Sequence, residues 1–118
     1  MIILTKQELI DYCLTYQDCY EDYPFKDDTN WAVMRHKSNR KIFAMFFEWN
    51  GKLCANLKCE PMRAEFLRNA VKGVIPGYHM NKTHWNTVFI DEVNDEELFD
   101  MISHSYSITQ KCTKKGTH

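Results

Sequence analysis

The chain has 118 residues, of which 44% are hydrophobic and 14% aromatic, and this predicts one folded domain and excludes both a disordered chain and two full domains. Its formal net charge of −1 at pH 7 excludes a uniformly basic surface for nucleic acid. The five cysteines include no C-x-x-C pair, which argues against a disulfide framework and against a ribbon-type zinc site.

The first predicted element is a helix that begins after Thr5. Thr5 and Glu8 have the spacing of a capping box, and an apolar stripe follows at helical spacing. The stripe consists of Leu9, Ile10, Cys13 and Leu14. Residues 17–29 contain an acidic cluster without a helical or alternating period, so they predict a long acidic loop.

Three strands joined by short turns are predicted at residues 31–36, 41–49 and 52–58. The middle strand is apolar on both faces, so the helices are expected to cover either its odd-numbered set (Phe43, Met45, Phe47) or the alternate residues. After it, Asn50-Gly51 predicts a type I′ hairpin, because both residues tolerate a positive φ. In the third strand the alternation directs Leu53, Ala55 and Leu57 toward the core and Lys52, Asn56 and Lys58 toward solvent.

A second helix is predicted to begin near Pro61, because the missing N–H of proline costs little in a first turn. Its predicted apolar stripe is Ala64, Phe66, Leu67, Ala70 and Val71. Residues 85–91 predict a further strand, and Asn94 is the expected N-cap of a last helix. The stripe of that helix is Leu98, Met101, Ile102 and Ser105.

These elements predict an α+β fold, in which an antiparallel sheet of four or more strands has helices packed on one face. The short connections exclude parallel pairing of the first three strands. One domain is expected over residues 1–109, followed by a polar, basic tail at residues 110–118. Without a charged leader or a long apolar run, the protein is expected to be cytoplasmic, with no membrane contact. The oligomeric state stays open, with a monomer favoured.

The segment GYHMNKTHWNTV, preceded by LKCEPMRAEFLRNA, resembles the signature of the MmcQ/YjbR-like family. The resemblance extends over nearly the whole chain. It implies a compact fold similar to that of the bacterial frataxin homologue (CyaY-like), in what is called a double-wing arrangement. Members of the family are commonly labelled DNA-binding proteins, so the resemblance also implies a nucleic-acid ligand.

Residues 78–85 of this segment form the candidate nucleic-acid-binding loop. The candidate residues are Tyr78, His79, Asn81, Lys82, His84 and Trp85, extended by Arg35, Lys37, Arg40 and Lys41 from the first hairpin. The polar and basic side chains can contact phosphates, and Tyr78 or Trp85 can stack on a base. With so few basic residues, DNA binding is expected to be weak and without strong sequence preference.

Other interpretations of the loop remain open. His84 and Trp85 can serve only to fix the entry into the last strand, with Asn81 at a positive-φ or helix-capping position. His79 and His84 are five residues apart and have no evident further ligands, so no metal site is predicted. No nucleophile turn, phosphate loop or cofactor motif accompanies them, so no catalytic residue and no cofactor is predicted.

The predicted function is therefore a small non-enzymatic binding module with nucleic acid as its ligand. The alternatives are a protein–protein adaptor that binds through the aromatic sheet face or the same loop, and an enzyme of unknown reaction that uses His79 or His84. A basic strip joining Lys82 to Arg35 and Lys37 favours nucleic acid. An exposed aromatic patch favours a protein partner, and a deep pocket with a perturbed histidine favours an enzyme.

Overall fold

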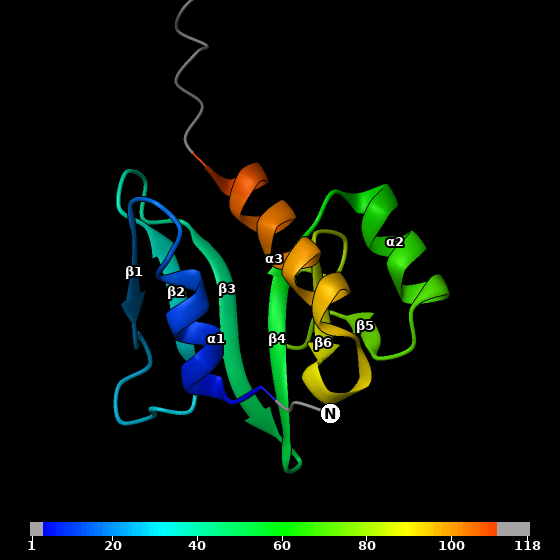
Figure 1. Cartoon of the computed structure of the whole chain (residues 1–118), viewed down its shortest axis with the longest axis horizontal. Helices are drawn as coiled ribbons and strands as arrows, with labels where there is room; N and C mark the ends of the chain where they lie inside the picture. The colour runs from blue at the N-terminus through cyan, green and yellow to red at the C-terminus, as the bar shows by residue number, and fades with distance from the viewer. Residues whose placement is uncertain (1–3, 111–118) are drawn as a thin grey trace, which may run out of the picture.

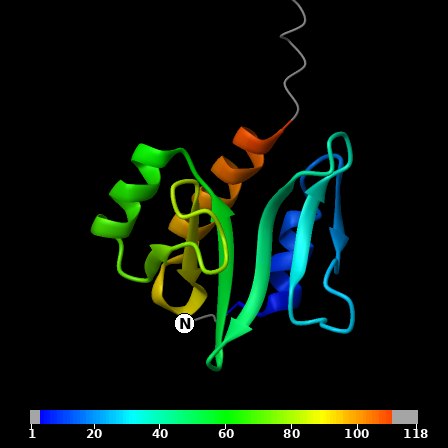
Figure 2. The same ribbon diagram turned by 180° about the vertical axis from the view of Figure 1, so that it is seen from behind.

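The computed structural model describes residues 4–110, which form a six-stranded antiparallel sheet with three α-helices on one face (Figure 1). The elements are α1 (Lys6–Cys13), β1 (Cys19–Asp22), β2 (Ala32–His36), β3 (Ile42–Trp49), β4 (Lys52–Lys58), α2 (Pro61–Ala70), β5 (Val74–Pro76), β6 (Trp85–Phe89), the 3-10 helix η1 (Ile90–Glu92) and α3 (Asp95–Thr109). The strand order is β1-β2-β3-β4-β6-β5. Figure 2 shows the opposite face of the sheet, with α1 and α3 behind it and α2 beside its edge. The predicted α+β fold is confirmed, and the predicted tail from residue 111 onward lies outside the described residues.

Local signals set the element boundaries as predicted. The Thr5 hydroxyl accepts a hydrogen bond from the Glu8 N–H at 3.1 Å, and the Glu8 carboxylate accepts one from the Thr5 N–H at 2.8 Å. Asn94 caps α3 by accepting from the Glu97 N–H at 2.8 Å. The β3–β4 hairpin turns at Asn50-Gly51, whose φ angles of 54° and 77° are those that a type I′ turn requires. The predicted capping motifs and hairpin are confirmed.

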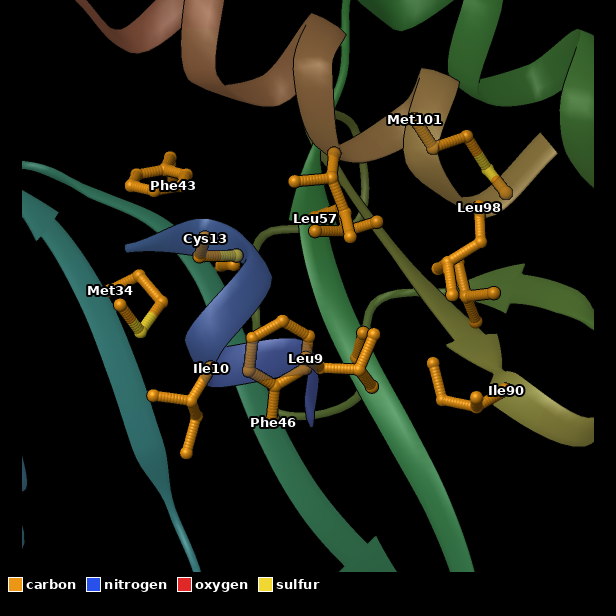
Figure 3. Packing of buried hydrophobic residues seen from close by; sticks show 14 of the residues in the cluster. Leu9, Ile10, Cys13, Met34, Phe43, Phe46, Leu57, Ile90, Leu98 and Met101 are labelled. Carbon is orange, nitrogen blue, oxygen red and sulfur yellow. The ribbon is translucent and has the colours of Figure 1, made fainter. Parts of the chain in front are cut away.

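A β-bulge in β3 decides which of its side chains face the helices. Met34 pairs with Ala44 whereas Arg35 pairs with Ile42, so Phe43 is an extra residue on β3. Phe43 therefore joins Ala44 and Phe46 in the core under the helices (Figure 3). This core also contains Leu9, Ile10 and Cys13 of α1, Leu57 of β4, and Leu98, Met101 and Ile102 of α3. The expected simple alternation was wrong at Phe43, because it did not allow for a bulge.

Two strands were missed in the sequence. Within the predicted acidic loop, Cys19–Asp22 forms β1 and pairs antiparallel with β2, with Tyr20 opposite Arg35. Val74–Pro76 forms β5, which pairs with β6 at the other edge of the sheet. Both strands are too short to show a clear alternation of apolar and polar residues. Hydrogen bonds to the neighbouring strand stabilise them, and the sequence of the short segment alone does not reveal this pairing.

Helix α2 covers less of the core than its stripe predicted. Among its residues only Ala64 is buried, whereas Phe66 and Met62 are 65% and 86% exposed. The helix packs at the edge of the sheet beside β5 and β6 and contacts it along one narrow line. Phe66 and Ala70 lie outside this line and face solvent. Leu14, the residue that follows α1, is likewise exposed, although it was expected to belong to the apolar stripe of that helix. None of the helices within residues 4–110 has the length and apolarity that a bilayer span requires.

Candidate functional site

The sheet face opposite the helices, here named the aromatic face, is covered and not solvated. Strand pairing aligns Met45, Asn56 and Thr87 across it, and aligns Phe47, Cys54 and Phe89 in the next row. Asn56 has no exposed surface, although the alternation of β4 predicted that it faces solvent. That prediction was wrong because residues 77–84, the covering loop, lie over this part of the sheet (Figure 2).

Two buried polar side chains, Asn56 and Thr87, attach the covering loop to the sheet. The Asn56 side-chain amide donates to the Tyr78 carbonyl at 3.0 Å. The Thr87 hydroxyl donates to the Asn56 side-chain oxygen and accepts from the Tyr78 N–H at 2.8 Å. Each group thus finds a partner away from water, and this closed network fixes the backbone at Tyr78.

Gly77 permits the close approach at the start of the loop. Its N–H donates to the Trp85 carbonyl at 2.9 Å. A Cβ atom at Gly77 would lie 2.8 Å from both the Cβ and the carbonyl oxygen of Trp85, closer than such atoms pack. The glycine is therefore needed for tight contact with β6, and not for a positive φ.

Most polar groups of the covering loop hold the loop itself. The Lys82 ammonium donates to the Gly77 carbonyl at 2.9 Å, across the loop. The Asn81 side chain accepts from the Thr83 N–H at 2.9 Å, and its carbonyl accepts from the Trp85 N–H at 3.0 Å. A positive φ was one of two alternatives for Asn81, and it occurs instead at His79, with a value of 62°. His79 is exposed at the tip of the loop.

Aromatic rings pack in two stacked pairs on this face. The Tyr78 ring stacks on Trp49, with centroids 4.1 Å apart and planes 14° apart. Trp31 stacks on Phe47 at 4.1 Å and 16°. One face of Tyr78 is thus occupied by Trp49, and Trp85 is half-buried within β6. The Tyr78 ring, which was expected to stack on a base, therefore already has one face covered.

A cleft of about 490 Å³ opens beside these stacks, between the covering loop and the segment that leads into β2. It is lined by Phe25, Lys26, Asp28, Trp31, Met45, His79 and Met80. Of the candidate residues only His79 reaches it. The other lining residues were missed because they come from three separate segments, although the aromatic residues that flank the acidic loop were a usable signal.

The basic candidates form a second group away from the covering loop. Lys37, Arg40 and Lys41 are exposed around the β2–β3 turn. Arg35 is bound there through its Nε to the Asp22 carboxylate at 2.8 Å, and its guanidinium also donates to the Arg40 carbonyl at 2.9 Å.

Lys82 lies in a different neighbourhood. It borders a separate hollow with Arg68 and Glu65 on the α2 side. Strands β3 and β4 lie between β2, which holds Arg35, and β6, which begins where the covering loop ends. The candidates of residues 78–85 therefore lie together, and so do those around the β2–β3 turn. The two groups do not form one continuous site.

The histidines within residues 4–110 lie in different environments. His84 is half-buried, and its carbonyl accepts from the Cys59 N–H at 2.8 Å. Burial lowers the pKa of His36 and of His104, but both lie on the helix side of the sheet, where His36 Nε2 is 2.7 Å from the Thr109 hydroxyl. Within residues 4–110 no three His, Cys, Asp or Glu side chains converge on one point.

Comparison with known proteins identifies relatives along most of the chain. A model of the YjbR family matches residues 14–108. The chain is 29% identical over 119 residues to YyaQ of Bacillus subtilis (strain 168), covering 92% of this chain and all of that protein (100%). It is 30% identical over 104 residues to YjbR of Escherichia coli (strain K12), covering 87% and 85% of the two chains. A crystal structure of a protein from Pseudomonas syringae superposes with a TM-score of 0.81 at 30% identity, covering 91% of this chain and 100% of that one. The names of these proteins state no activity.

Replacing Asn56 with alanine is expected to loosen the covering loop. The Asn56→Ala variant leaves the Tyr78 carbonyl and the Thr87 hydroxyl without their buried partner, so the free energy of unfolding should fall by about 1–3 kcal/mol. Denaturant unfolding measures this change. Thr83→Ala, at an exposed position of the same loop, is the control and should stay within about 0.5 kcal/mol of the parent. Equal stability of all three proteins would contradict the anchoring role of Asn56.

Proposed function

The chain belongs to the YjbR family, and from this premise we propose that it is a small non-enzymatic binding module whose ligand is another protein, held at the cleft on the aromatic face. The cleft itself is the observation that supports this function most strongly. It lies between two loops and is floored by Met45, a buried residue of the sheet. Rigid scaffolds commonly bind ligands through loops placed in this way.

The residues at the cleft have the composition of a protein-binding surface. Phe25, on its rim, is 47% exposed, and Trp31 lies beside it with ring centroids 6.0 Å apart. Exposed aromatic residues next to a hollow are enriched where proteins bind each other. The thioethers of Met45 and Met80 add an adaptable apolar lining.

The lining also argues against catalysis. Among the residues within 4–110 that line the cleft, His79 is the one histidine, and none is a serine, threonine or cysteine that could act as a nucleophile. Asp28 and Lys26 supply charges at the rim, but the described residues place no paired acid and base there. A binding role therefore fits this cleft better than a reaction.

Nucleic acid is the second candidate ligand, and the β2–β3 turn supports it. Lys37, Arg40 and Lys41 are all exposed there, within five residues of one another. Arg35 is already paired with Asp22, so about three basic groups remain for phosphates. This site is independent of the cleft, and the DNA-binding label of the family agrees with it.

Removing the Phe25 ring should weaken capture of the partner protein. We expect Phe25→Ala to reduce the amount of a specific partner captured from a lysate by about fivefold or more, as truncation of an interface hot spot does. The matched control is Met62→Ala, which removes an exposed apolar side chain from α2. Quantitative mass spectrometry of the captured proteins provides the measurement. Loss of the partner with Met62→Ala and its retention with Phe25→Ala would show that α2, and not the cleft, is the binding surface.

DNA binding through the β2–β3 turn should be weak and should depend only modestly on salt. Three neutralised phosphates predict a log–log salt slope of about −2.7 on duplex DNA, at about −0.9 for each. A fluorescence-anisotropy titration at several salt concentrations measures it. The Lys37→Glu/Arg40→Glu double variant should abolish binding, whereas Lys82→Glu should not. If Lys82→Glu weakens binding as strongly as the double variant does, the covering loop and not the turn contacts DNA.

A further inference from the structure

Three aromatic rings line the cleft, and two of them are inclined to the third. Relative to Trp31, the Phe25 ring lies 6.0 Å away at an angle of 77°, and the His79 ring lies 6.2 Å away at 53°. By contrast, Trp31 and Phe47 stack closely at 4.1 Å and 16°. Phe25 and His79 therefore contact Trp31 at an incline on the cleft side, whereas the stacked ring of Phe47 supports Trp31 from the sheet side.

Aromatic walls of this kind suit a cation with a flat or rounded apolar surface. A guanidinium or ammonium group placed against the face of tryptophan is attracted by the negative π surface of the ring. The apolar lining from Met45 and Met80 reduces the contact of such a group with water and accommodates its alkyl stem. The aromatic and apolar lining also suits an uncharged apolar group, so the charges at the rim decide between the two classes of ligand.

The rim of the cleft has an excess of negative charge. In the segment 25–31, Asp27 and Asp28 outnumber Lys26, and both Asp28 and Lys26 line the cleft. One carboxylate oxygen of Asp28 accepts from the Asn30 N–H at 3.0 Å, which fixes the carboxylate at the cleft. This field attracts a cationic side chain and repels a phosphate backbone.

We propose that the cleft receives an arginine side chain of the partner protein, with the guanidinium against Trp31 and near the carboxylate of Asp28. Arginine fits better than lysine, because its planar and weakly hydrated guanidinium stacks on aromatic faces. The inference rests on the proposed protein-binding function and adds the chemistry of the group that is bound. Lys26 also lines the cleft and opposes this ligand, so its removal strengthens binding.

Three short peptides test the selectivity of the cleft. Their sequence is Gly-Gly-X-Gly-Gly with blocked ends, where X is arginine, leucine or glutamate, and each is titrated into the isotope-labelled protein. The arginine peptide should shift the NMR signals of Trp31, Asp28 and His79. Its affinity should exceed that of the leucine peptide by about fivefold or more, the combined effect of one cation–π contact and one exposed ion pair. The glutamate peptide should leave these signals unchanged.

Charge variants then test the roles of the two rim residues with opposite signs. Asp28→Asn keeps the acceptor for the Asn30 N–H, yet it should lower the affinity for the arginine peptide by about two- to fivefold. Lys26→Glu should raise this affinity by a similar factor. Lys37→Glu makes the same charge change at the β2–β3 turn and is the control, with no expected effect on the affinity. If Asp28→Asn and Lys26→Glu change the affinity in the same direction, or not at all, the inference is wrong.

The outcomes separate this inference from the function on which it rests. Equal binding of the arginine and leucine peptides at the cleft overturns the preference for a cation and leaves a protein-binding cleft in place. If no peptide shifts the cleft signals, both the inference and the proposed function fail. Pentathymidine is titrated in parallel, and shifts of Trp31 and His79 caused by it would assign the cleft to nucleic acid and overturn both.

Discussion

The structure of the aromatic face depends on the hydrogen bonds of the buried Asn56 side chain. It joins a central strand to the covering loop through the Tyr78 carbonyl and the Thr87 hydroxyl. Because an amide buried without partners is costly, β4, β6 and the loop are compatible only in this arrangement. A polar group at the middle of an apolar sheet thus specifies where the loop lies.

The arrangement of the aromatic rings follows from this attachment. With its backbone held at Tyr78, the loop stacks that ring on Trp49 and extends His79 toward Trp31. The sheet therefore has a second buried layer on the side away from the helices, where Val33, Met45, Phe47 and Cys54 lie outside the main core. The cleft forms where this layer ends, between the loop tip and Phe25.

The sequence predicted those features that neighbouring residues determine and missed those that distant residues determine. Asn50-Gly51 and the N-caps at Thr5 and Asn94 act within one turn, so their positions were readable. The alternation in β4 correctly separated its two faces, yet it contained no sign that the face of Asn56 would be covered. The resemblance to a known family directed attention to His79 but not to Trp31, because contact between their segments exists only in the folded chain.

Hydrogen exchange at the Tyr78 amide tests the central claim most directly. This N–H donates to the Thr87 hydroxyl beneath the covering loop, and not to a backbone partner in the sheet. If the Asn56 network holds the loop on the sheet, the Tyr78 amide exchanges as slowly as the amides that pair β4 with β6. Exchange at the rate of an unprotected loop amide would contradict the account, because the loop would then open without any unfolding of the sheet.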